Sequence, residues 1–170
     1  MTYEALEQPD GLQWPCPSDG HPGTAILHQQ QFTRGKGRFH PVTYREPAEI
    51  PDEDYPYFLT TGRVISQWHT GSMTRRSPAL DSEFPEPFLE LSPEDAEKLG
   101  IEDGEQVEVS SRRGEIQIKA LVTDRIKAGV VFIPFHFAES AANVLTNSAL
   151  DPVAKIPELK VCAVRIKKGG

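Results

Sequence analysis

Short apolar runs separated by turn residues recur from Tyr57 to the end of the chain. YFLTT (57–61), FPEPFLEL (84–91) and VCAVRI (161–166) each have the length of one strand and are rich in β-branched or aromatic residues. The run VVFIPFHF (130–137) is apolar almost throughout, which predicts a strand at the centre of the fold. These patterns predict a mainly β domain.

Strict alternation of apolar and polar residues marks a further pair of strands. Val107 and Val109 alternate with polar neighbours, and the residues that share one face of the following strand do the same after an RRG turn. This pattern predicts a β-hairpin with one buried face. Its two tip residues, Arg112 and Arg113, are interpreted as solvated side chains. The residues on the face of the second strand are Ile116, Ile118, Ala120 and Val122.

One short helix is predicted between two of the strands. Ser92 is placed as an N-cap, Pro93 occupies the first helical position, and acidic residues follow in the first turn. Gly100 can end the helix in the left-handed conformation. The prediction is a helix of about 7 to 9 residues.

The first third of the chain lacks such regularity. Three prolines lie between residues 11 and 23, where they oppose both helix and interior strand. A basic turn follows at 34–38, then a strand-like run, FHPVTY (39–44), and a linker rich in proline and acidic residues at 45–56. We therefore expect an extended arm at 1–54 and a compact domain at 55–170.

Composition narrows the classes of function. The 170 residues are 38% apolar, which suffices for one core, and the formal charge of −7 opposes binding to nucleic acid. No apolar run approaches the roughly 20 residues of a spanning helix, so we expect a cytoplasmic protein without membrane contact. Cys16 and Cys162 form no C-x-x-C pair, which argues against an iron-sulfur or zinc site. The five histidines have no metal-site spacing, and no metal ligand is assigned.

One basic stretch stands against the acidic background. No Asp or Glu occurs from Tyr55 to Leu80, whereas Arg63, Arg75 and Arg76 give three fixed positive charges among many hydroxyls. Such a stretch suits phosphates joined to a flat ring system, although a strand followed by a solvated polar loop explains the composition equally well. Three further polar residues have the character of groups that hydrogen-bond a heterocycle: Asn143, Thr146 and Asn147.

Three separated motifs make the chain recognisable. They are TTGRVISQWHTGSMTRR (60–76), SPEDAEKLGIEDGEQVEVSSRRGEI (92–116), and PFHFAESAANVLTNSALDP (134–152) with its PELKVCAVRI ending. In this order they resemble the C-terminal domain of molybdopterin oxidoreductases, above all the large subunit of formate dehydrogenases. The arm, from GLQWPCP to FTRGKGRFHPV, resembles the segment that precedes this domain.

The resemblance implies a fold and a site. The fold is a six-stranded double-psi β-barrel like that of aspartate decarboxylase, with short helices and an extended N-terminal arm. In the family, this domain is a lid over molybdenum or tungsten held by two molybdopterin guanine dinucleotides (bis-MGD). Phe135 would face the substrate. The cofactor-binding positions carried over are Thr61, Gly62, Arg63, Gln67, Trp68, His69, Thr70, Asn143 and Lys160.

The implied function is cofactor binding within a formate dehydrogenase, which oxidises formate to CO2 as a complete enzyme. The family keeps its iron-sulfur cysteines, the Cys or selenocysteine on the metal, and its catalytic His and Arg in other domains. We therefore expect no catalytic residue, no metal ligand and no iron-sulfur cluster in this chain, and no activity from the chain alone. The expected partners are the remaining domains or subunits, on which the arm would pack, and a small-molecule substrate.

Other functions stay open at this point. The equivalent domain of a nitrate reductase shares the GR-x5-HTGSMTRR run. A self-processing barrel of the aspartate decarboxylase type would need a bond such as Gly71–Ser72 for cleavage. A protein-interaction barrel, as in chaperone ATPases, is the third alternative, but a hydroxyl-rich loop is a poor hot spot.

Overall fold

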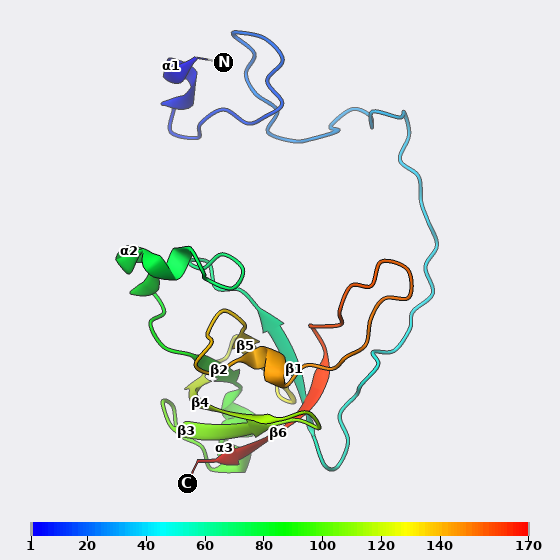
Figure 1. Ribbon diagram of the computed structural model, residues 1–170. Coiled ribbons are helices and arrows are strands. Elements are labelled where there is room, and N and C mark those ends of the chain that lie inside the picture. The colour runs from blue at the N-terminus through cyan, green and yellow to red at the C-terminus, as the bar shows by residue number, and fades with distance from the viewer. Residues whose placement is uncertain (1, 170) are drawn as a thin grey trace. The chain divides into compact units, whose positions relative to one another are not determined.

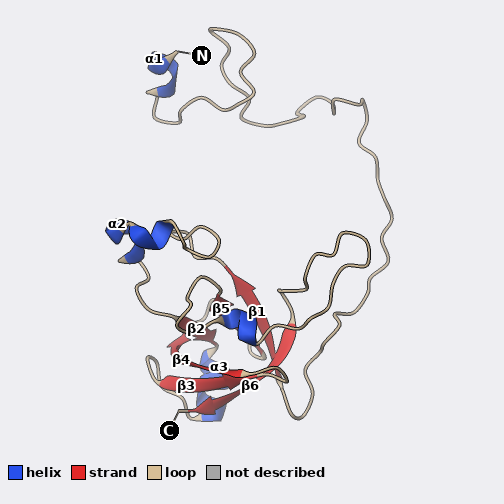
Figure 2. Ribbon diagram, viewed as in Figure 1, coloured by secondary structure: helices blue, strands red, loops and turns tan. Residues whose placement is uncertain are grey.

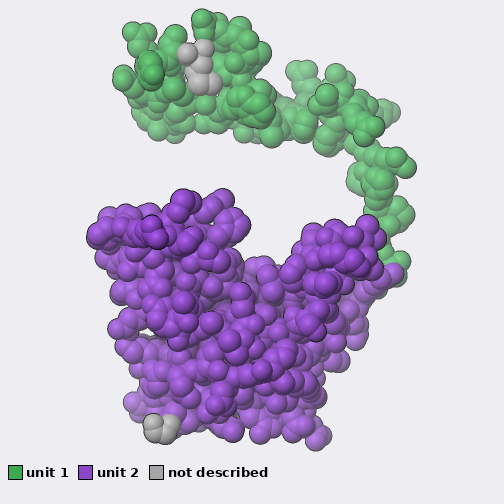
Figure 3. All heavy atoms as spheres, viewed as in Figure 1, with its two compact units in different colours: residues 1–44 green, residues 45–170 purple. Residues whose placement is uncertain are grey.

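The chain forms two compact units, residues 1–44 and residues 45–170 (Figure 3). The computed structural model describes residues 2–169. The sequence placed the start of the compact domain at 55, ten residues later, because the acidic segment before it has the composition of a linker. Within residues 2–169, no helix is both long enough and apolar enough to cross a bilayer.

The first unit contains little regular structure. A one-turn helix, α1 (Tyr3–Leu6), is capped by the Thr2 hydroxyl, which accepts the Ala5 N–H. The strand expected at 39–44 is wrong, since these residues are irregular and exposed, with Phe39 97% exposed. Pro41 has no N–H to donate, and no neighbouring strand pairs with the segment in the described chain.

The second unit is a closed barrel of six strands (Figures 1 and 2). Around the barrel the order is β1-β5-β2-β4-β3-β6, in which β1 and β5 are parallel, β2 and β4 are parallel, and the other pairs are antiparallel. Closure leaves no open sheet edge. The strands are β1 (Tyr57–Gly62), β2 (Phe88–Leu91), β3 (Gln106–Ser110), β4 (Glu115–Val122), β5 (Val130–Pro134) and β6 (Cys162–Lys168).

Two connections of the barrel interlock. The chain from β1 to β2 passes over β5, and the chain from β4 to β5 passes over β2. Exchanging β1, β2 and β3 for β4, β5 and β6 leaves the strand order unchanged, so the barrel has internal two-fold pseudosymmetry. Two interlocked crossings of this kind define a double-psi β-barrel, and the predicted fold is confirmed.

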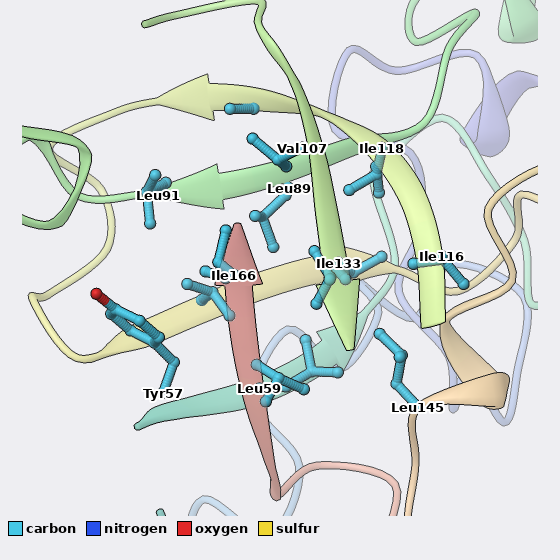
Figure 4. Packing of buried hydrophobic residues seen from close by; sticks show 14 of the residues in the cluster. Tyr57, Leu59, Leu89, Leu91, Val107, Ile116, Ile118, Ile133, Leu145 and Ile166 are labelled. Atoms are coloured by element: carbon cyan, nitrogen blue, oxygen red, sulfur yellow. The ribbon is translucent and has the colours of Figure 1, made fainter. Parts of the chain in front are cut away.

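The core lies inside the barrel (Figure 4). The predicted alternation holds on the hairpin, where Val107 and Ile118 are buried and point inward (Figure 4) and Val109 is buried as well. Leu59 of β1 and Ile133 of β5 are fully buried, which confirms β5 as a central strand. All six strands contribute apolar side chains to this core.

The predicted helix is confirmed as α3 (Pro93–Leu99). The Ser92 hydroxyl accepts the Asp95 N–H, and Gly100 ends the helix with a φ of 65°. The buried carboxylate of Asp95 also accepts the Gly129 N–H at 2.7 Å, which fastens the β4–β5 connection to the helix. The shorter helices are η1 (Thr74–Arg76) and α2 (Pro78–Asp81), between β1 and β2, and η2 (Ala142–Val144), between β5 and β6.

The segment before β1 is attached to the hairpin tip. Glu49 accepts hydrogen bonds from Arg112 and Arg113 and from the Ala163 N–H, and Arg112 also pairs with Asp52. The interpretation of these arginines as solvated is therefore wrong. Burial acts to raise the pKa of Glu49, but hydrogen bonds from Arg113, Ala163 and Arg112 outweigh it and hold that pKa below its usual value.

Candidate functional site

Two long connections leave the same end of the barrel. β1 and β5 are parallel and pair at Gly62 and Pro134, so their carboxyl ends lie side by side. The Phe135 N–H donates to the Gly62 carbonyl at 3.1 Å just beyond them. Residues 63–87 and 135–161 therefore start next to each other. They project on either side of this end, and the surface of the second unit is hollowed between the projections (Figures 1 and 3).

The strand end and the last turn before β6 meet at this end of the barrel. The Thr61 hydroxyl donates to the Leu159 carbonyl at 2.7 Å, and the Lys160 ammonium donates to the Thr61 carbonyl. A Cβ on Gly62 would lie 2.6 Å from the Phe132 ring and 3.8 Å from Lys160 Nζ, so glycine is required for this approach. The structure thus brings Lys160 to Thr61 and Gly62, although Lys160 follows Thr61 by 99 residues in the sequence.

Arg63 continues this surface into the loop. Its guanidinium lies over the Trp68 ring, 4.7 Å from the centroid, and His69 meets the same ring edge-on at 4.7 Å. Within residues 2–169, no carboxylate forms an ion pair with Arg63. His69 has a φ of 50°, a left-handed conformation that makes the chain turn at this point. Arg63, Trp68 and His69 are exposed, as is Thr70.

Gln67 is buried, unlike Trp68 and His69 after it. Its side chain is 3% exposed, and its carbonyl oxygen accepts the Thr74 hydroxyl at 2.6 Å. The same hydroxyl accepts the Trp68 N–H at 3.1 Å. The Gln67 side chain therefore shapes the loop. Next to it, the buried Ser66 hydroxyl has no partner among the described residues.

Asn143 lies on η2, beside the β3–β4 turn. Its neighbour Val144 fills the space above Gly114, and η2 packs against β4. No hydrogen bond within residues 2–169 joins the Asn143 side chain to Thr61, Arg63 or Lys160. Phe135 is half-buried against the core and reaches this end of the barrel through its backbone bond to Gly62.

The two other polar residues of that connection are engaged within the chain. Asn147 donates its amide to the Val161 carbonyl and accepts the Ala149 N–H. Thr146 donates to the Asn143 carbonyl. Asn147 therefore stabilises the loop, and its side chain is not free to bond a heterocycle.

The loop after β1 also contributes to an ion cluster that the sequence did not predict. Arg75 donates to both oxygens of Glu139, each at 2.9 Å, and to Asp81 at 3.1 Å. His136 lies nearby, 4% exposed, and neither ring nitrogen has a partner among the described residues. Burial and, after it, the charge of Arg75 lower the pKa of His136. No local signal could reveal these contacts, because Arg75 and Glu139 are 64 residues apart.

The donors at this end of the barrel suit an anionic ligand. Among residues 2–169, Arg63 has no carboxylate partner and the Lys160 ammonium, which has three donors, bonds to a carbonyl only. Glycine at 62 allows close backbone approach, and an exposed aromatic ring lies beside the guanidinium. Phosphate oxygens and a flat ring match this set. Among residues 2–169, no group of three or more His, Cys, Asp or Glu side chains could hold a metal ion.

Comparison with known proteins identifies the family. Residues 57–163 match the model of the Molydopterin dinucleotide binding domain. The chain belongs to this family. The matched residues include the strand end at Thr61–Gly62, the loop after it and Lys160, which are the positions that the structure brings together.

Relatives in the family are much longer than this chain. The alpha subunit of F420-dependent formate dehydrogenase from Methanocaldococcus jannaschii is 56% identical over 170 residues, which are 99% of this chain and 25% of that protein. The catalytic subunit of the assimilatory nitrate reductase from Bacillus subtilis is 40% identical over 171 residues, which are 98% of this chain and 24% of that protein. The chain thus spans about a quarter of the length of the curated relatives it matches.

A solved structure supports the fold. Acetylene hydratase from Pelobacter acetylenicus superimposes with a TM-score of 0.64 and 21% sequence identity. The match covers 75% of this chain and 21% of that protein.

Proposed function

We propose that the chain is the molybdopterin guanine dinucleotide-binding domain of a formate dehydrogenase, and that it works together with domains or subunits that lie outside residues 1–170. The observation that supports this most directly is the meeting of Thr61, Gly62 and Lys160 at the start of a loop whose Arg63 has no carboxylate partner among residues 2–169. Higher identity to a formate dehydrogenase than to a nitrate reductase favours formate, oxidised to CO2, as the small-molecule substrate.

Each residue would have a distinct role toward the cofactor. Arg63 and Lys160 would bind phosphate oxygens, and His69 would add a further donor. Trp68 offers an exposed ring face, and Asn143 offers an amide with no side-chain partner within residues 2–169. Phe135 would face the substrate. Thr61, Gly62, Gln67 and Thr70 would shape the loop and present backbone groups, since Thr61 and Gln67 use their side chains within the chain.

The bound cofactor, bis-MGD with molybdenum or tungsten, supplies the metal and the redox chemistry of the reaction. In this proposal the chain contributes no metal ligand, no iron-sulfur cluster and no catalytic residue, and the isolated chain does not oxidise formate. Both cysteines are free thiols, which suits a reducing compartment such as the cytoplasm. Burial raises the pKa of the Cys162 thiol to about 11, so it stays protonated and is no nucleophile.

The arm also has a role in this proposal. Residues 1–44 expose large apolar side chains, among them Trp14 at 78% and Val42 at 90%. A unit with this surface needs a cover, and the other domains of a complete enzyme would provide one.

A chimera tests the proposal. The stretch of the M. jannaschii alpha subunit that matches this chain is replaced by the 170 residues, and the purified subunit is assayed for guanine nucleotide content, bound metal and formate oxidation. We expect all three to be retained. The same exchange in the B. subtilis nitrate reductase is expected to give weaker cofactor retention and little nitrate reduction. Better function in the nitrate reductase would reverse the assignment.

Substitutions in the chimera test the site. Arg63→Ala and Lys160→Ala should each lower cofactor affinity about tenfold, since a hydrogen bond to a charged group contributes about 1.5 to 3 kcal/mol. Lys160→Ala should be the more sensitive to salt. Arg112→Ala is the control, because this arginine pairs with Glu49 and Asp52 at the hairpin tip. Full nucleotide content in both site variants, together with loss in Arg112→Ala, would place the cofactor at the hairpin tip instead.

A further inference from the structure

The three arginines of the acid-free stretch differ in what they contact. Arg63 stacks on Trp68, and Arg76 has no carboxylate partner within residues 2–169. Arg75 alone among them binds two carboxylates, through three of its five N–H donors. Its hydrogen bonds to Glu139 raise the pKa of Arg75 further and lower that of Glu139.

The whole length of the Arg75 side chain is fixed by packing. The guanidinium lies 5.1 Å from the centroid of the buried Phe137 ring. At the other end, a Cβ on Gly71 would lie 2.9 Å from Arg75 Cγ, and the Arg75 N–H donates to the Gly71 carbonyl at 2.9 Å. The arginine therefore bridges the loop after β1 and the loop after β5 in one defined position.

This bridge is connected to the surface that would meet a ligand. Thr74, the residue before Arg75, binds Gln67 through its hydroxyl and accepts the Trp68 N–H. Trp68 in turn lies under the Arg63 guanidinium. Fixing residue 75 against the loop after β5 thus orders the backbone of Trp68, whose ring lies under the Arg63 guanidinium.

The local charge argues against direct phosphate binding by Arg75. One guanidinium faces the two carboxylates of Glu139 and Asp81, which leaves one negative charge in excess. A phosphate that approached Arg75 would have to displace a bidentate carboxylate in the presence of a second one. Arg63 and Lys160 have no such competitor among the described residues.

We infer that Arg75 is a positioning residue, which Glu139 and Asp81 hold against Phe137 so that the 63–77 loop presents Arg63 and Trp68 to the anionic part of the ligand. The inference rests on the proposed function for the identity of that ligand, and on the contacts of Arg75 for the rest.

The test uses the 170-residue chain with Trp14→Phe, which leaves Trp68 as its single tryptophan. Guanosine 5′-diphosphate, which has the base and the two phosphates of the proposed ligand, is titrated, and acrylamide quenching of Trp68 is measured without it. Glu139→Gln and Arg75→Gln should increase quenching of Trp68 and weaken nucleotide binding about tenfold, the effect of one charge-assisted hydrogen bond. Arg75→Lys should restore binding only in part, because lysine lacks the bidentate fork.

Arg76→Gln is the matched control and should change neither readout beyond its loss of one charge. The direction in which Glu139→Gln changes the affinity for nucleotide is decisive. If Arg75 itself binds phosphate, removal of its competing carboxylate strengthens nucleotide binding, and this result would overturn the inference.

Failure of the proposed site has a different signature. Suppose that the parent chain binds no nucleotide but Trp68 still becomes more accessible in Arg75→Gln and Glu139→Gln. The proposed ligand is then wrong, and the positioning role of Arg75 stands. Unchanged quenching in both variants, with far-UV circular dichroism showing intact folds, disproves the positioning role whatever the nucleotide does.

Discussion

The two ends of the barrel perform the same topological task with very different lengths of chain. The crossing from β4 to β5 takes seven residues (123–129), and its pseudosymmetric counterpart from β1 to β2 takes 25 (63–87). The second pair differs in the same direction, with 14 residues (92–105) between β2 and β3 and 27 (135–161) between β5 and β6. Both long connections lie at the end where β1 and β5 finish.

The ends also differ in charge. The short connections contain seven acidic and three basic residues, whereas the long ones contain six acidic and five basic residues. Acidic side chains at the short-loop end stabilise the fold by accepting backbone hydrogen bonds. Asp95 accepts the Gly129 N–H, and Asp103 accepts the Val122 N–H. Closing this barrel therefore needs few residues, and in the proposed function the additional chain at the other end serves the ligand.

Replacing the long crossing by a copy of the short one should have the largest effect. A variant in which residues 63–87 are replaced by a copy of 123–129 should keep the barrel, because seven residues suffice at the equivalent place, and should lose nucleotide binding altogether. Circular dichroism and isothermal titration with guanosine 5′-diphosphate measure the two properties. An unfolded variant would show that the long crossing is needed for the barrel, and persistent binding would remove the loop from the site.

Truncation in the barrel wall should cost far more than truncation in the loop that leaves it. Leu59→Ala deletes a fully buried side chain and should lower the free energy of unfolding by about 2 to 5 kcal/mol. Ile65→Ala, six residues later, removes a side chain that is entirely exposed and should change it by less than about 0.5 kcal/mol. Urea titrations compare them, and equal losses would mean that the loop is part of the core.

At the short-loop end the attachment of the crossing can be weakened directly. Asp95→Ala leaves the Gly129 N–H and the Ser92 hydroxyl without their acceptor and should cost about 1 to 3 kcal/mol. Asp124→Ala, in the crossing itself, removes an exposed carboxylate and should be close to neutral. A neutral Asp95→Ala would show that the crossing is held by its length alone.

Among these four connections, only the long ones contain histidine. One of these histidines, His136, should make the stability of the fold depend slightly on pH. Burial and then Arg75 lower the pKa of His136, while Asp81 and Glu139 act in the opposite direction with less weight. The unfolded state therefore binds the proton more readily, so stability is full above about pH 6.5 and falls as the pH drops through the window below it.

Thermal unfolding between pH 7.5 and pH 5 measures this effect. His136→Phe should flatten the dependence, whereas His40→Asn, a change in the exposed arm, should leave it unchanged. A dependence that survives in His136→Phe would assign it to another group.

Local patterns were sufficient for some elements and insufficient for others. Ser92, Pro93 and Gly100 define a helix by their own chemistry, and the alternation around Val107 and Ile118 defines the hairpin. Contacts between distant residues have no such signal, so the sequence predicts a linker at Glu49 and a solvated tip at the two arginines that bind it.

The candidate site shows the same division. Charge alone predicts the basic stretch, whereas only the family resemblance implies that Lys160 belongs with it. The structure shows that this meeting depends on β6 lying beside β1. The partners of Arg75 could not be foreseen, because Glu139 reaches it only through the pairing of β1 and β5.

The place of β6 has a consequence for biosynthesis. β6 fills the space between β1 and β3, and its residues are made about 100 positions after the start of β1. On the ribosome, β1 and β3 therefore keep unpaired edges until Cys162–Lys168 has left the exit tunnel. A pause before that point exposes two strand edges and an open core to other nascent chains, and we expect stalled intermediates ending before β6 to require chaperone protection that the completed barrel does not need.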